Sequence, residues 1–172
     1  KVEDIIRGII IQSGNDACIV IAEALSGSEE AFAVEMTARG KELGMTNSSF
    51  KNATGWPHPD HLTTARDLAV LSQKLIKDFP EYYRYFSEKS FTYNGIKQSN
   101  RNPLLYKDMG SDGLKTGHTK ESGYGLAASV ERRGRRLILV INGLPSRKAR
   151  SRDPERILDW GFREFENYKL FK

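Results

Sequence analysis

The chain has 172 residues, of which 38% are hydrophobic and 28% charged, and it carries a formal net charge of +5 with a pI of about 9.3. This length suits one domain with a core of its own, and the composition excludes an intrinsically disordered chain. No apolar run approaches the roughly 20 residues that a membrane-spanning helix needs. A single cysteine, Cys18, excludes an internal disulfide, and its apolar neighbours predict a small core residue.

The first part of the chain has a helical pattern. Ile5, Ile6, Ile9 and Ile10 recur at helical spacing, which predicts an opening helix over residues 1–11. The polar turn Ser13-Gly14-Asn15-Asp16 interrupts it, and a second helix is expected over residues 16–25. Ser28 is placed to cap a third helix, which we expect to end at Gly44.

The middle of the chain combines an irregular loop with further helix. Residues 45–62 predict a loop, because two near-adjacent prolines exclude a regular helix there. A fourth helix, capped by Thr63 or Thr64, is expected to run to Asp78, where a following proline ends it. A short aromatic helix is expected over residues 82–86.

After residue 90 the hydrophobic period changes to that of antiparallel strands. Asn94-Gly95 between two short runs predicts a hairpin with a type I′ turn. A second hairpin is expected to pair residues 124–130 with 136–142 around an arginine-rich tip. Because residues 137–141 are apolar throughout, we expect a central strand that is covered on both faces. A last helix is expected to start at Asp153-Pro154.

Helices first, then antiparallel strands, then a covering helix define an α+β domain over residues 1–172. In the last helix, burial of the Trp160 ring would make Trp160→Ala cost about 3–5 kcal/mol of stability.

The most informative stretch is Gly113-Leu114-Lys115-Thr116-Gly117-His118-Thr119. An ammonium, a hydroxyl and a backbone that a glycine leaves open suit an anionic ligand or a developing oxyanion. Strand alternation sends Lys115 and Thr116 to opposite faces, so we expect a twist or bulge near Gly117 to bring both to one ligand. Taken alone, the stretch also fits a polar strand end beside a glycine turn.

A second motif, Ser13-Gly14-Asn15, lies far upstream and places a hydroxyl and an amide two residues apart. Alone it is weak, because serine and asparagine at a helix start are usually caps. Together with Lys115-Thr116-Gly117 it becomes specific, since S-x-x-K, S-D-N and K-T-G form the signature set of class A β-lactamases and penicillin-binding proteins.

With these two motifs, Asn52–His61 and Asp112–His118 together, the chain resembles the serine D-alanyl-D-alanine carboxypeptidases along nearly all of its length. These are the low-molecular-mass penicillin-binding proteins of bacteria. The resemblance implies a β-lactamase/transpeptidase-like fold, in which helices flank an antiparallel sheet. It also implies a periplasmic enzyme anchored to the inner membrane, whose substrate is a peptidoglycan stem peptide ending in D-Ala-D-Ala and whose inhibitors are β-lactams. We expect no metal, cofactor or nucleic-acid partner.

The resemblance also implies roles for individual residues. Ser13 matches the serine that passes a proton to the leaving group, and Asn15 matches the amide that contacts the acyl side of the substrate. Lys115 and Thr116 match the pair that orients Ser13 and engages the terminal carboxylate. The other matched positions are Gly117, the backbone N–H of His118 as one half of the oxyanion hole, and Arg101 and Arg150 at the carboxylate end.

The first motif of the family, which carries the nucleophilic serine and its lysine base, is missing ahead of Ser13. Ser48-Ser49-Phe50-Lys51 has the S-x-x-K spacing, but it follows Ser13 and lies in a predicted loop that would not hold serine and lysine one helical turn apart. We therefore expect residues 1–172 to be a partial catalytic domain that lacks its N-terminal part and is inactive alone.

Two other functions stay open. A β-lactamase needs a base for its deacylating water, classically a glutamate in a loop between the second and third motifs. Residues 47–62 contain no glutamate, which counts against this alternative. A non-catalytic basic domain would use the clusters at 132–136 and 146–152, but neither lies in a recognisable nucleic-acid-binding motif.

Overall fold

The structure is a computed structural model that describes residues 1–168. Its helices are α1 (Val2–Arg7), η1 (a π-helix, Gly8–Gln12), α2 (Asn15–Ser26), α3 (Glu29–Leu43), α4 (Ala65–Asp78), α5 (Pro80–Tyr83), the 3-10 helices η2 (Arg84–Ser87) and η3 (Pro103–Tyr106), and α6 (Arg147–Glu164). Its strands are β1 (Ser90–Tyr93), β2 (Ile96–Ser99), β3 (Ser111–Thr119), β4 (Gly123–Arg132) and β5 (Arg135–Leu144). None of the helices within residues 1–168 has both the length and the apolar character required of a membrane span.

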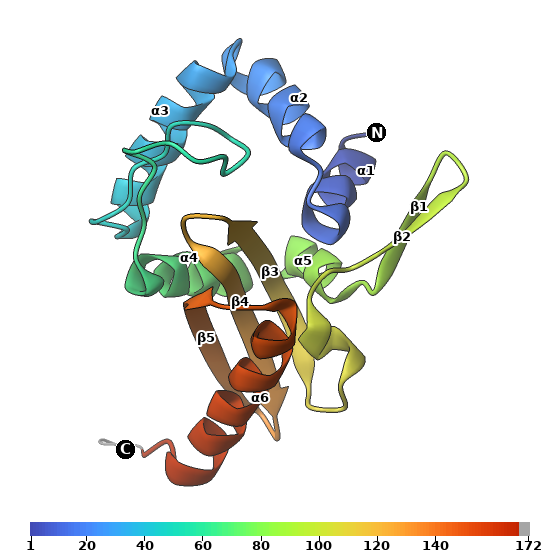
Figure 1. The fold of residues 1–172 in the computed structure, drawn as a ribbon, viewed down its shortest axis with the longest axis vertical. Helices are drawn as coiled ribbons and strands as arrows, with labels where there is room; N and C mark the ends of the chain where they lie inside the picture. Colours follow the sequence, from blue (N-terminus) through green and yellow to red (C-terminus); the bar gives the residue numbers. More distant parts are fainter. Residues whose placement is uncertain (169–172) are drawn as a thin grey trace.

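An antiparallel sheet in the order β3-β4-β5 forms the centre of the domain, with α6 on one face and α4 on the other (Figure 1). Alternate residues of β4, namely Leu126, Ala128 and Val130, are at most 1% exposed and pack against Leu158 of α6. Burying such side chains contributes about 1.5–3 kcal/mol each relative to exposure. This core fixes β4, the strand paired with the one that carries the lysine motif, against α6. The predicted α+β class is therefore confirmed.

Local signals fixed several elements as expected. Ser28 and Thr64 cap α3 and α4, because their hydroxyls accept hydrogen bonds from the backbone N–H groups three residues on. The β1–β2 and β4–β5 hairpins turn through Asn94-Gly95 and Arg133-Gly134, whose φ angles are all positive, as a type I′ turn requires.

The prediction that residues 137–141 form a central strand is wrong. Among the described residues 1–168, they lie in β5, which is an edge strand of the three-stranded sheet. Their apolar character has another cause. Leu137, Leu139 and Ile141 pack on the core cluster that includes Leu158 of α6, and Ile138 lines a cavity together with Ile76 of α4. A continuous apolar run reports that both faces of a strand are covered, and it says nothing about the number of neighbouring strands.

The last helix begins seven residues earlier than predicted, since Asp153 was the expected cap and Ser146 is the observed one. Ser146 is its N-cap and accepts a hydrogen bond from the backbone N–H of Ala149, and Asp153-Pro154 lies inside the helix. Proline has no N–H, so the carbonyl of Arg150 loses its usual helical donor. The helix nevertheless continues through this point, and Pro154 is fully buried. The basic cluster at 146–152 therefore lies on the first turns of α6.

Trp160 is 48% exposed, which contradicts the buried ring considered above. Its ring makes an edge-on contact with Phe165 at a centroid distance of 5.0 Å. We expect Trp160→Ala to lower the free energy of unfolding by about 1 kcal/mol. Leu158→Ala on the buried side of the same helix should cost about 2–5 kcal/mol. Urea unfolding of the two variants measures both values, and equal costs would contradict the burial difference.

Cys18 is half-buried and is not part of the core, contrary to the prediction. It lies on α2, one turn after Asn15, on a helix in which only Ala22 is fully buried. Burial is still sufficient to raise the pKa of its thiol.

Candidate active site

Ser13 occupies a sharp turn between η1 and α2. The π-helix ends with the backbone N–H groups of Ser13 and Gly14 both directed to the carbonyl of Gly8. Ser13 itself is left-handed, with φ 62° and ψ 46°, a region that non-glycine residues rarely occupy. Strained backbone of this kind and π-turns are both frequent at functional sites. Ser13 therefore lies in the turn itself, directly after η1 and two residues before the start of α2.

Lys115 lies on β3, an edge strand of the sheet. It pairs with Ala127 and shares a face with Gly113, and this face is opposite to the α6 core. The register of β3 shifts between Ser111 and Gly113, so Asp112 is an extra residue, as in a β-bulge. The pairing is regular from Gly113 to Thr119. The expected bulge near Gly117 is therefore absent from β3, whose irregularity lies five residues earlier. The β4–β5 register does shift between Tyr124 and Leu126, beside the partner of Gly117.

The two motifs meet in space. Lys115 Nζ donates to Ser13 Oγ at 2.8 Å and to the carbonyl of Thr116 at 3.0 Å. The ammonium thus has one partner on its own strand and one in the turn before α2. A hydrogen bond from a charged donor is about twice as strong as a neutral one, so it holds the Ser13 hydroxyl in a fixed direction.

Burial, and then the positive charge of Arg101, lower the pKa of Lys115 from its ordinary 10.5 to about 8, and Arg150 contributes in the same direction. We expect a ¹³C NMR titration of the Lys115 side chain to give a midpoint near pH 8. In the unfolded chain the Lys115 ammonium keeps its proton up to about pH 10.5. Below pH 8 the ammonium is charged in both states, and the full cost of burying that charge is subtracted from the stability of the fold. The penalty, on the order of 3 kcal/mol, should disappear as the pH rises from 8 to 10.5. A midpoint above pH 10 would contradict the buried geometry.

The predicted carboxylate-binding residues lie around the other side of β3. Thr116 pairs with the core residue Leu126 and is 9% exposed, so it lies on the α6 face. Arg150 of α6 is equally buried and donates from Nη1 to the carbonyl of Gly117 at 3.3 Å. Burial lowers the pKa of Arg150, and neighbouring Arg147 and Arg101 add to this effect. Two arginines and Lys115 therefore gather their positive charges at this end of the strand.

Arg101 is exposed on a loop that two buried asparagines fix. Asn100 Oδ1 accepts from the backbone N–H of Asn102, and Asn102 Oδ1 accepts from that of Leu104. This loop follows β2 and brings Arg101 close enough to depress the pKa of Lys115.

The remaining predicted residues are exposed. Asn15 is the first residue of α2 and lies open to solvent two positions after Ser13. His118 is exposed on β3, and its ring lies 4.0 Å from that of Tyr124 on β4. The oxyanion role of the His118 backbone N–H stays a prediction.

Tyr124 was not singled out from the sequence. It faces His118 across the strand pair, and the Arg150 guanidinium lies 5.4 Å from its ring centroid. The sequence offered one signal for it, because Tyr124 is the first residue of the strand expected over residues 124–130, close in sequence to the lysine motif.

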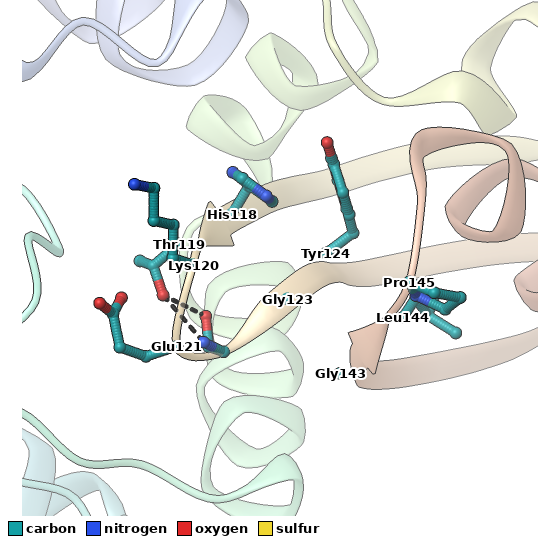
Figure 2. A pocket seen from close by; sticks show the side chains of 10 residues that line it. His118, Thr119, Lys120, Glu121, Gly123, Tyr124, Gly143, Leu144 and Pro145 are labelled. Carbon is teal, nitrogen blue, oxygen red and sulfur yellow. Dashed lines mark hydrogen bonds between the residues drawn. The ribbon is translucent and has the colours of Figure 1, made fainter.

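A cavity of about 390 Å³ lies at the end of β3, next to His118. Figure 2 shows that the turn between β3 and β4 forms one wall, with Thr119 hydrogen-bonded to Ser122, and that Leu144 and Pro145 lie on the opposite side. The cavity adjoins the motif strand, but neither Ser13 nor Lys115 lines it.

The literal S-x-x-K at Ser48 has a structural role. Ser48 is 2% exposed, and its Oγ donates to Asp67 Oδ2 at 2.7 Å and lies 2.8 Å from Thr63 Oγ1. These contacts fasten the loop over residues 45–62 to the start of α4. They leave the hydroxyl without access to a ligand.

The fold and the paired motifs are those of penicillin-binding proteins and transpeptidases. Penicillin-binding protein 5 from Haemophilus influenzae matches with a TM-score of 0.93 and 42% identity, over 98% of this chain and 50% of that one. Penicillin-binding protein D2 from Listeria monocytogenes, solved in its ampicillin-bound form, matches with a TM-score of 0.87 and 34% identity, over 95% of this chain and 68% of that one.

The sequence comparison narrows this class to one family. A family profile described as D-alanyl-D-alanine carboxypeptidase (Peptidase_S11) matches residues 1–146. D-alanyl-D-alanine carboxypeptidase DacC of Escherichia coli is 46% identical over 100% of this chain and 43% of its own length. The chain therefore belongs to the D-alanyl-D-alanine carboxypeptidase family. It spans less than half the length of this relative.

Proposed function

We propose that residues 1–172 form part of the catalytic domain of a serine D-alanyl-D-alanine carboxypeptidase, which removes the terminal D-alanine from peptidoglycan stem peptides. The observation that carries the proposal is the 2.8 Å hydrogen bond from Lys115 to Ser13. It joins two family motifs that lie about a hundred residues apart in the chain. Family membership and the clustered positive charge at the same site support it.

Hydrolysis of a terminal D-alanine needs a nucleophile, a base, an acid for the departing amine and recognition of a free carboxylate. This chain supplies the last two. The Ser13 hydroxyl, oriented by Lys115, passes a proton to the amine as the peptide bond breaks. Thr116, Arg101 and Arg150 attract the carboxylate of the substrate. Asn15 holds the acyl side, and Gly117 leaves room for the substrate beside the strand.

The nucleophilic serine and its lysine base belong, in this proposal, to a segment that precedes Lys1 in the natural protein. Family order places S-x-x-K before Ser13, and Ser48 is buried against Asp67. The nucleophile attacks the carbonyl of the penultimate D-alanine and forms an acyl-enzyme, with the His118 backbone N–H as one donor to the oxyanion. Water then releases the shortened peptide. We propose that the enzyme is periplasmic, where its substrate is found, and that the full-length protein is anchored to the inner membrane.

The test uses the protein extended through its preceding segment. A fluorescent penicillin should label it covalently, and an N-acylated peptide ending in D-Ala-D-Ala should release D-alanine. Ser13→Ala should slow that release by about 10²–10⁴, the usual value of a placed acid–base group. Fast turnover of penicillin without a lasting adduct would indicate a β-lactamase instead. Labelling of Ser48 in the 172-residue chain would overturn the assignment of the nucleophile.

A further inference from the structure

The segment Pro80–Glu88, here called the bridging segment, lies between the two halves of the site. It comprises α5, η2 and the following residue, and it packs against both η1 and β3. Figure 1 shows α5 between the end of α1 and the upper part of β3. Ser13 follows η1 directly, and Lys115 lies on β3. The two groups therefore come from separate layers that share this segment as a neighbour.

One end of the bridging segment binds the helix pair that leads to Ser13. Arg7 Nε donates to Glu88 Oε2 at 2.8 Å, and its guanidinium also lies over the ring of Tyr85, 4.5 Å from the centroid. Tyr85 OH donates to Glu3 Oε1 at 2.8 Å. Below these polar contacts, Tyr85 packs on the buried face of η1. The Arg7–Glu88 pair is only 20% and 30% exposed, so solvent weakens it less than a surface pair.

The other end binds the bulge of β3. Tyr83 OH donates to Asp112 Oδ1 at 2.8 Å, and Arg136 of β5 donates to both oxygens of the same carboxylate at 2.6 and 2.9 Å. Tyr83 also lies close over Gly113, where an added Cβ would be 2.7 Å from its hydroxyl oxygen. The absence of a side chain at Gly113 lets the segment touch the strand. Lys115, two residues on, points to the same face.

We propose that the bridging segment is a positioning element that sets the distance between Ser13 and Lys115, through the Arg7–Glu88 ion pair at one end and the Tyr83–Asp112 hydrogen bond at the other. The bulge matters because a one-residue change of register would turn Lys115 to the opposite face of β3. This inference rests on the proposed function for its biological meaning, since Ser13 and Lys115 are the groups it aligns. Its geometric content is testable without catalysis.

The test measures the pKa of Lys115 by ¹³C NMR and the thermal midpoint of unfolding in the 172-residue chain. Glu88→Ala and Tyr83→Phe each remove one contact. Glu42→Ala is the matched control for the ion pair, because Glu42 pairs with Arg39 within the exposed face of α3 at 2.7 Å. Tyr82→Phe is the matched control for the hydroxyl, because Tyr82 is an adjacent tyrosine that is 54% exposed.

If the segment aligns the site, either test variant lets water reach the ammonium of Lys115 and raises its pKa by about one pH unit, a tenfold change in acidity. The double variant should raise it further. The charged and titratable groups near Lys115, namely Arg101, Arg150 and Cys18, are unchanged in every variant. Both controls should leave the pKa of Lys115 where it is in the original chain.

A lower thermal midpoint with an unmoved Lys115 pKa would mean that the segment only stabilises the fold, and it would overturn the proposal. An unmoved pKa and an unmoved midpoint would overturn it as well. A Lys115 pKa near 10.5 in the original chain would instead contradict the Ser13–Lys115 geometry, and with it the proposed function. If the extended protein releases D-alanine normally but neither Glu88→Ala nor Tyr83→Phe changes the pKa of Lys115, the proposed function stands and only the positioning role is refuted.

Discussion

Lys115→Ala in the protein extended through its nucleophile segment is expected to slow penicilloyl-adduct formation by about 10²–10⁴. The variant loses the ammonium that donates to Ser13 at 2.8 Å, and it loses one of the positive charges that attract the substrate carboxylate in the proposed function. The fold should survive, because the side chain is a buried cation whose lowered pKa shows that its charge is held at a cost. Stopped-flow mixing with a fluorescent penicillin gives the rate.

Lys115→Met is the matched variant, since it keeps the length of the side chain and removes only the charge. It should be as slow as Lys115→Ala and at least as stable. Circular dichroism and a thermal melt of both proteins provide the control. An unfolded Lys115→Met protein would show that the lysine is structural, and acylation at the original rate would remove it from the site.

Gly110→Ala is expected to lower the free energy of unfolding by about 2–5 kcal/mol. Gly110 precedes β3 with φ +79°, and its missing Cβ would lie 2.4 Å from the carbonyl oxygen of Glu131. That φ costs an L-residue about 1–2 kcal/mol, and forcing an atom into the contact costs about 1–3 kcal/mol more. The same glycine carbonyl accepts from the backbone N–H of Glu131 at 2.9 Å, so the start of β3 would have to move.

Gly134→Ala separates the two contributions. Gly134 has φ +75° at the tip of the β4–β5 hairpin, and nothing lies within 4 Å of its missing Cβ. Only the backbone term of about 1–2 kcal/mol applies there. Denaturant unfolding of both variants yields the difference. Equal losses would show that the contact with Glu131 relaxes without cost.

Elements with short-range signals were predicted well from the sequence. The caps at Ser28 and Thr64 and the turn at Asn94-Gly95 depend on hydrogen bonds and φ angles within four residues, so the residue types decide them. The start of α6 was predicted wrongly because a local signal was followed where a different one decides. Asp153-Pro154 is a strong local start signal, and the earlier cap at Ser146, together with packing of Pro154, overrides it.

The residues of the site were found from their motifs, and the contact between Ser13 and Lys115 was expected only from the family resemblance. Spacing in the sequence cannot show that Ser13 and Lys115 touch, and the resemblance to a family supplied that expectation. The bulge at Asp112 left no sequence signal, and the two side chains that bind the Asp112 carboxylate, a tyrosine and an arginine, come from other elements. Long-range contacts of this kind decide which face a strand residue takes, and local propensity does not encode them.

The backbone of Ser13 has a consequence for protein engineering. Threonine is the obvious chemical substitute for serine, since it keeps the hydroxyl. At φ 62° a β-branched residue is sterically disfavoured, so Ser13→Thr would exchange a retained functional group for a displaced main chain. Asparagine and glycine, which lack the hydroxyl, are the residues that this turn accommodates most readily. At position 13, the substitute that is chemically most similar to serine is therefore the one that the backbone conformation tolerates least.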